Sequence, residues 1–271
     1  MEIKTEKKMR ALALIGIFLA FALFVLPAVF ALSPTGANVT NLNSTSSPAD
    51  DATSDNAFAG NVTNLNVFGI SNTQAWQGYF GNVTGVIQLA DGSDNVLYNW
   101  SQTSPRGQVY ASTNNTIYWS NIQCFNFTAN GSYNNEAGNG GTTNLYGTNL
   151  SILDAQYGLN ITEGDPDSIN TTFQLIGPGT HNLFYTASNQ FNVGECQNTR
   201  VYDSSGGGVA NHFEEVLLYE PVTTSVVFTS LLNHQVNGFD SYPHDFEMMV
   251  LENGHGTDVS TTPYYFFVEL Q

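Results

Sequence analysis

Four apolar runs in the last third of the chain, separated by prolines, constrain its fold more than any other feature. Several of them are apolar almost throughout, which is typical of strands covered on both faces. No stretch shows sustained helical periodicity, so the sequence predicts an all-β protein built as an antiparallel sandwich. The four runs are 213–219, 225–232, 245–251 and 264–270, with Pro221, Pro243 and Pro263 between them.

Shorter strand-like runs occupy the middle of the chain. VTGVIQLA (83–90) and VLYNWS (96–101) flank DGSDN, whose Asp, Gly and Asn residues favour a hairpin turn. Long Asn/Gly-rich loops and at most one short helix, in NLSILDAQYGL (149–159), complete a β-sandwich of jelly-roll or immunoglobulin-like type. Further strands are expected from Gly107 (GQVYAS), Thr116 (TIYWS) and Cys124 (CFNFTA).

The first 31 residues have the layout of a signal peptide. Four basic residues in MEIKTEKKMR precede an uncharged apolar run at 11–26, then Pro27 and a small-residue exit ending at Ala31. Spanning a bilayer takes roughly 20 apolar residues, and Pro27 would break a helix near its outer end. We expect cleavage after Ala31 and an extracellular or cell-surface location. A retained membrane anchor and a prepilin-type cut near Arg10 are the alternatives.

Composition divides the rest of the chain in two. Residues 32–60 are rich in Ser, Thr, Asn, Ala and Asp and have few large apolar side chains, which predicts a flexible arm. Residues 61–271 suffice for one large β-sandwich domain or two packed sub-sandwiches.

Charge is distributed unevenly along the chain. Four of the six Lys and Arg lie in the leader, so only Arg106 and Arg200 remain, with no lysine. Without Glu2 and Glu6, 23 − 2 = 21 carboxyl groups face two arginines, a formal charge of 2 − 21 = −19. Such a surface repels phosphate backbones and excludes nucleic acid as a partner. The absence of lysine also excludes Schiff-base chemistry and lysine–asparagine cross-links.

Cys124 and Cys196 are the two cysteines of the chain. In an exported protein an even pair predicts one disulfide, here closing a loop of about 70 residues. Neither has a neighbouring Cys or His at zinc-finger spacing, so the alternative is a pair of buried thiols.

Acceptor triplets for N-glycosylation, Asn-x-Ser/Thr, are frequent and unevenly placed. All eleven lie before Thr172, although asparagine continues to Asn253. If they are used, the first two thirds of the chain faces outward under glycan, and the last third forms core or interface. The candidates are Asn38, Asn43, Asn61, Asn82, Asn99, Asn114, Asn126, Asn130, Asn149, Asn160 and Asn170.

The hexapeptide NVTNLN occurs at 38–43 and again at 61–66, and a third copy begins as NVTG at Asn82. In extended conformation such a segment can add as a strand to the open sheet edge of a neighbour. Head-to-tail contacts of this kind need not close and so build filaments. The alternative is two chance matches in an Asn/Thr-rich arm.

No catalytic motif is found, which predicts a protein that is not an enzyme. The chain lacks a GxSxG elbow, HExxH, a phosphate-binding loop and a dinucleotide fingerprint. His212 with Glu214, and His255 with Asp258, are the histidine–acid pairs that could serve as acid, base or ligand. Zinc needs three or four ligands, which spacing does not assemble.

Oxygen-rich clusters make calcium the only cofactor worth considering, because hard oxygen ligands suit an exported acidic chain. One cluster is Asp91, Asp94 and Asn95, and the other is Glu163, Asp165 and Asp167. Neither follows the EF-hand pattern, and both are equally compatible with turns.

Aromatic residues raise the possibility of a sugar-stacking platform. Trp76 and Tyr79 lie in AWQGYFG, and Trp100 and Trp119 follow. They would bind a glycan if they emerged on one face, whereas burial in the core is the alternative.

The signal segment, the Asn/Thr/Gly-rich composition, the dense glycosylation triplets and the near absence of lysine together resemble archaeal cell-surface glycoproteins such as S-layer or filament subunits. The resemblance implies an exported, N-glycosylated structural or adhesive protein that associates with itself or with other cell-surface components. A secreted carbohydrate-binding module, with a glycan as partner, is the second hypothesis and a secreted hydrolase the third.

Overall fold

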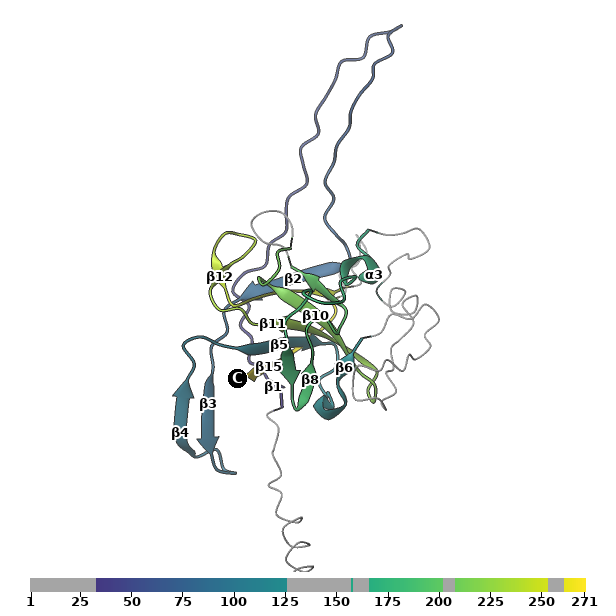
Figure 1. Ribbon diagram of the computed structural model, residues 1–271. Coiled ribbons are helices and arrows are strands. Elements are labelled where there is room, and N and C mark those ends of the chain that lie inside the picture. The colour runs from purple at the N-terminus through teal and green to yellow at the C-terminus, as the bar shows by residue number, and fades with distance from the viewer. Residues whose placement is uncertain (1–32, 126–156, 158–165, 202–207, 253–260) are drawn as a thin grey trace, which may run out of the picture. The chain divides into compact units, whose positions relative to one another are not determined.

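The computed structural model describes residues 33–125, 157, 166–201, 208–252 and 261–271 (Figure 1). The predicted leader and the predicted short helix at 149–159, apart from Tyr157, lie outside these ranges. No helix in the ranges is long and apolar enough to cross a membrane. Residues 33–271 group into one compact unit.

The described elements are almost entirely β-strands. They are β1 (Thr35–Gly36), β2 (Trp76–Gly81), β3 (Val86–Ala90), β4 (Val96–Ser101), β5 (Gly107–Ser112), η1 (Trp119–Asn121), β6 (Gln123–Cys124), α3 (Ile169–Thr172), β7 (Phe184–Thr186), β8 (Asn189–Phe191), β9 (Asn198–Arg200), β10 (Glu214–Glu220), β11 (Ser225–Leu231), β12 (Val236–Asn237), β13 (Pro243–His244), β14 (Phe246–Leu251) and β15 (Tyr265–Leu270).

Seven strands form one antiparallel sheet, which we call the main sheet. Its order is β1-β15-β5-β11-β10-β6, and β9 pairs with the same edge of β10 as part of that sheet. The central strands β10 and β11 are buried along nearly their whole length, as their continuous apolar runs predicted. The prediction of an all-β, antiparallel, sandwich-like protein is confirmed.

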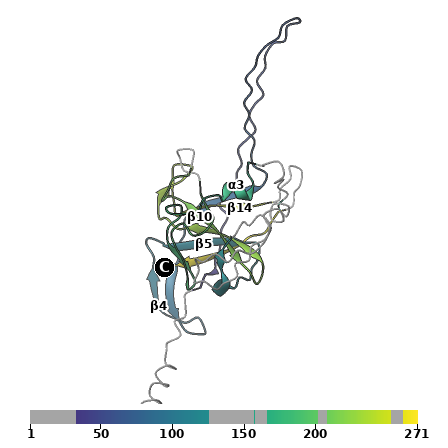
Figure 2. The ribbon, with the colours of Figure 1, turned by 45° about the vertical axis from the view of Figure 1, so that its right-hand side comes forward.

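One face of the main sheet packs against the two-stranded sheet formed by β14 and β2. Leu217 and Tyr219 of β10 point to this face and join Met248 and Val250 of β14 in one apolar cluster. Figure 2 brings β14 and β10 into view together. This second layer buries the face that would otherwise meet water.

The opposite face is covered by irregular chain and by the β7–β8 hairpin. Val216 and Leu218, the alternate residues of β10, pack there with Phe184 and Phe191 of the hairpin. The Cys124–Cys196 disulfide lies in the same cluster and confirms the predicted pairing.

Most of the longer predicted strands are present within one or two residues, but one prediction was wrong. The run from Thr116 forms no strand, because Asn121 N donates to Tyr118 O and the chain turns through η1. Ile117 and Trp119 are nevertheless buried on either side of the exposed Tyr118. The segment thus shows the alternation of buried and exposed side chains that is typical of a strand, although it pairs with no strand of the sheet.

Candidate functional site

An extended segment, residues 38–74, connects the edge of the main sheet to β2. Before it, Thr35 and Gly36 pair with Val268 and Phe267, and Ala37 N donates to Phe266 O at 2.9 Å. After it, Glu252 N donates to Ala75 O at 2.7 Å. The segment contains no strand and is exposed at every residue (Figure 1).

The extended segment consists of two legs joined by a turn at residues 58–61. It turns where Asn61 N donates to Phe58 O, with Gly60 in the left-handed region at φ 91°. Asn72 Nδ2 donates to Ser47 O at 2.8 Å and so links the two legs. Its first leg belongs to the predicted arm, whereas its second leg lies beyond residue 60.

Large apolar side chains are exposed along this segment. Water covers most of their surface, and no described residue packs on them to form a core. So many exposed apolar side chains make this segment a candidate interaction surface. The residues are Val39, Leu42, Phe58, Val62, Leu65, Val67, Phe68 and Ile70.

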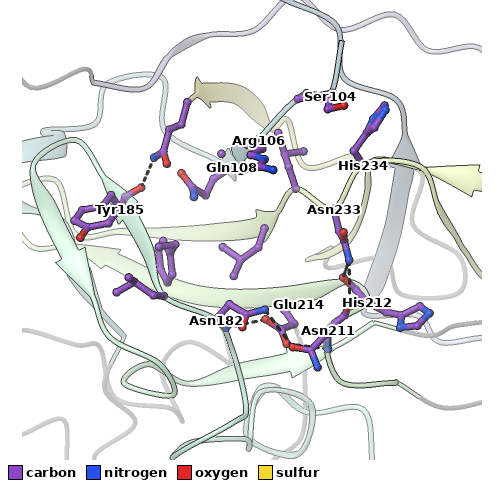
Figure 3. Close-up of a pocket in the computed structure, with 17 residues that line it drawn as sticks. Ser104, Arg106, Gln108, Asn182, Tyr185, Asn211, His212, Glu214, Asn233 and His234 are labelled. Carbon is purple, nitrogen blue, oxygen red and sulfur yellow. Dashed lines mark hydrogen bonds between the residues drawn. The ribbon is translucent and has the colours of Figure 1, made fainter. Parts of the chain in front are cut away.

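A pocket of about 690 Å³ lies where the loop before β5 meets the end of β11 (Figure 3). Its lining is rich in amides and includes Arg106, one of the two arginines outside the leader. Tyr185 lies at one side of the pocket and Glu214 at another. Such a surface offers hydrogen-bond donors, acceptors and one cation to a polar ligand.

Glu214 is the one acidic side chain among the described residues that line the pocket. Its two oxygens accept hydrogen bonds from Asn182 N at 2.9 Å and Asn211 N at 3.2 Å. Hydrolysis of a glycosidic bond ordinarily needs two facing carboxyl groups, and the described lining supplies a single one. The predicted partner His212 lines the same pocket, but no described residue bonds its Nδ1.

His234 and Asp245 form a hydrogen-bonded pair at the pocket rim that the sequence analysis missed. His234 Nδ1 donates to Asp245 Oδ1 at 2.8 Å, and Asp245 also accepts from Val83 N and Gln235 N. Burial raises the pKa of Asp245, but these hydrogen bonds together outweigh it and hold the pKa below the usual value. Because the carboxylate joins the chain just after β2 to the residue before β12, its first role is structural.

The predicted calcium clusters are turn structures where the chain is described. Asp91 Oδ1 accepts from Ser93 N and Asn95 N, both at 2.9 Å, within the β3–β4 turn. Asp94 has φ 62°, the conformation that completes this turn. Asp167 Oδ2 accepts from Thr73 Oγ1 at 2.6 Å, while Glu163 and Asp165 lie outside the described residues. No cluster of three or more metal-ligating side chains occurs in the described ranges.

The four predicted stacking residues are not brought together on one face. Trp119 is buried in the main-sheet core, and Trp76 packs on Phe173 at 6.0 Å between ring centroids. Tyr79 is half-buried in the apolar cluster that also contains Trp76 and lies on the other face of the main sheet from Trp119. Only Trp100 is largely exposed, beside Tyr98 on the β3–β4 hairpin at 4.8 Å.

Seven of the predicted glycosylation sites are described. Asn38, Asn43, Asn61, Asn82, Asn99 and Asn170 are exposed, and Asn114 is half-buried. The remaining candidates, Asn126, Asn130, Asn149 and Asn160, lie outside the described residues, as do His255 and Asp258.

Comparison with known proteins found no matching family model, no similar curated protein and no similar solved structure.

Proposed function

We propose that this protein is exported to the cell surface, carries N-linked glycans, and acts as a structural or adhesive subunit that associates with its own copies. The extended segment carries the proposal, because its apolar side chains are exposed and belong to neither apolar cluster of the described residues. A surface of this kind becomes stable when a partner covers it.

The short strand β1 supports the same proposal. It shows that the chain close to the predicted cleavage site can add to an edge of the main sheet, at Phe267 and Val268 of β15. A segment that adds to its own sheet can add to the same edge of a neighbour, as in strand-exchange assemblies.

The proposal is tested on protein isolated from its native cell surface, by intact mass, N-terminal sequencing and electron microscopy. A start at Leu32, added hexose mass and filaments or arrays are the expected results. A bare, monodisperse monomer would contradict it, and a start near Leu12 would favour the prepilin-type alternative.

A substitution experiment locates the association in the extended segment. Leu65→Asp, Val67→Asp and Phe68→Asp in one chain should abolish self-association measured by sedimentation velocity. Ser46→Asp, Thr53→Asp and Ser54→Asp add the same charge at exposed polar positions of the same segment, outside every glycosylation triplet, and should leave association largely intact. Equal loss in both variants would attribute the effect to charge alone.

The pocket favours a second candidate function, recognition of a saccharide. Amide side chains and Arg106 provide the polar contacts, and the exposed ring of Tyr185 provides an apolar face. Isothermal titration with neutral and acidic oligosaccharides checks this candidate. Binding by the monomer that Arg106→Gln weakens would support it, and no heat with either class would remove it.

A further inference from the structure

The two strands of the second layer, β14 and β2, differ in how their outer edges are occupied. Glu252 N donates to Ala75 O in the register that pairs Leu251 with Trp76. Hydrogen-bonded pairs alternate along an antiparallel ladder, so the backbone groups of every second residue point away from the partner strand. In β14 these outward residues are Glu247, Met249 and Leu251, and in β2 they are Trp76, Gly78 and Phe80.

The outer edge of β14 is closed by the main sheet. Ser230 Oγ donates to Glu247 O at 2.8 Å, and Glu215 Oε2 accepts from Met249 N at 2.8 Å. Ser230 of β11 is paired with Glu215 of β10. One cross-strand pair of the main sheet therefore bonds both Glu247 O and Met249 N. Tyr264 OH completes the edge by donating to Leu251 O at 2.7 Å.

The outer edge of β2 has no strand partner among the described residues. Three hydrogen bonds of β2 to described residues lie outside its pairing with β14. The indole of Trp76 donates to Asp167 O, Gln77 Nε2 donates to Gly78 O at 2.7 Å, and Gly81 O at the strand end accepts from Asp245 N at 2.8 Å. Gln77, Gly78 and Phe80 are exposed, and a Cβ placed on Gly78 would meet nothing within 4 Å. Within the described part of the chain, the edge is therefore unpaired and sterically accessible.

This open edge also lacks the usual protection against pairing. Exposed edges are commonly blunted by charged side chains, prolines or bulges. From Asn56 to Ala90 the chain contains no Asp, Glu, Lys, Arg, His or Pro, and the β2–β14 register is regular. The edge of β14 is hydrogen-bonded at each of its three outward residues, so the unprotected edge of β2 is the candidate for strand addition.

We infer that the outer edge of β2 accepts a strand from a second copy of the chain, and that residues 64–70 of that copy, NLNVFGI, are the strand. This inference rests on the proposed self-association and names its acceptor and donor. The added strand would extend the second layer from two strands to three.

Charge and apolar content identify this occupant. The formal charge of the chain is −17, and −19 once the predicted leader is removed, so copies repel each other and close contact is favoured between stretches without charge. Residues 64–70 lie in the same uncharged stretch as β2 and are already extended and exposed. They carry four exposed apolar side chains in seven residues, whereas the first leg, 38–57, carries only two large ones, Val39 and Leu42.

Gly78→Pro tests the acceptor edge in the full-length protein. Proline removes the outward N–H of position 78 and blocks pairing, yet it is tolerated on the solvent side of an edge strand. Self-association measured by sedimentation velocity should weaken at least tenfold. Gly78→Ala, which keeps the N–H and fits the open space, should associate like the native protein. Native-like association of a folded Gly78→Pro protein would overturn the inference.

Amide exchange followed by NMR provides a test that needs no substitution. In dilute protein the amides of Gly78 and Phe80 should exchange fast, while those of Gln77 and Tyr79, which point into the β14 ladder, are protected. Raising the protein concentration should slow alternate amides of residues 64–70 and, within β2, those of Gly78 and Phe80. Exchange at these two amides that stays fast in the associated state would overturn the inference.

Two outcomes separate this inference from the broader proposal. If the triple Asp variant at residues 65, 67 and 68 fails to associate but Gly78→Pro associates normally, the extended segment drives assembly at another edge. If Gly78 and Phe80 are protected at every concentration, residues 64–70 pair with β2 of their own chain, and the second-copy assignment is wrong.

Discussion

Glu215 lies near the start of β10, and its side chain is fully buried between the two layers. Its Oε2 accepts the hydrogen bond from Met249 N, and no described residue bonds its Oε1. Burial raises the pKa of this carboxyl well above its usual value, and the single hydrogen bond offsets only part of that effect. The folded protein therefore holds a proton here at pH values where the unfolded chain has released it.

Glu215→Gln should change the pH dependence of stability. The unfolded chain ionises this group near its ordinary pKa of 4.5 and the folded chain only at higher pH. The free energy of unfolding therefore falls as pH rises from about 5, by up to about 1.4 kcal/mol per pH unit. The glutamine variant should gain stability relative to the native protein between pH 5 and 8, as measured by urea unfolding.

Some slope should persist in Glu215→Gln, because burial also raises the pKa of Glu269. Parallel stability curves for native protein and Glu215→Gln would contradict the assignment of a neutral Glu215.

Asn114 is the half-buried residue among the described glycosylation candidates, and both polar atoms of its side-chain amide are hydrogen-bonded. Its Nδ2, the atom to which a glycan would be attached, donates to Ser225 Oγ at 3.0 Å. Its Oδ1 accepts from Thr116 N at 2.9 Å. We expect peptide mass spectrometry of the native protein to find glycan at the exposed Asn99 and none at Asn114. Glycan on Asn114 would show that the site is modified before this part of the chain folds.

Among the elements, the disulfide joins β6 on the outer side of β10 to the chain just before β9, across a sequence separation of 72. Both cysteines are buried in the cluster beneath the β7–β8 hairpin. The bond therefore holds two short strands against the same central strand.

Cys124→Ala with Cys196→Ala should lower the free energy of unfolding by about 4 kcal/mol, because the unfolded chain regains the entropy that a loop of this length removes. Urea unfolding of the variant and of native protein with the disulfide reduced should give similar midpoints. A loss under about 1 kcal/mol would mean that the strand pairing alone holds these segments.

Element prediction from sequence succeeded where the apolar pattern reflects membership of a sheet. The β3–β4 hairpin and strands β5, β10, β11, β14 and β15 follow the predicted runs. β2 was read only as an aromatic cluster, since the two glycines of WQGYFG weaken its strand pattern. The short strands β7 to β9 lie in polar sequence, and their pairing is set by the disulfide and the core beneath them.

For the whole molecule, net charge and an uncharged interface predict a characteristic salt response. Raising NaCl from 10 mM to 500 mM shortens the screening length from about 30 Å to a few ångström, so repulsion between copies weakens. The apolar contacts proposed for β2 and residues 64–70 contain no ion pairs to lose. Sedimentation velocity should therefore show stronger association at high salt.

Calcium chloride at matched ionic strength is the control for this prediction. Equal effects of the two salts would indicate screening alone. Stronger association with calcium would indicate bound ions, and weaker association at high salt would contradict an uncharged interface.

The sequence alone determined the all-β class, the central strands and the cysteine pair, because apolar periodicity, turn residues and an even cysteine count are local or composition-level signals. It also identified Asn-rich segments and an excess of carboxyl groups, which depend on no fold. Tertiary structure decided which edges are open. Only the alternation of hydrogen bonds along β14 and β2, and the reach of Ser230, Glu215 and Tyr264 to one edge, separates a closed strand from an open one. Those contacts join residues far apart in the chain, and no local pattern encodes them.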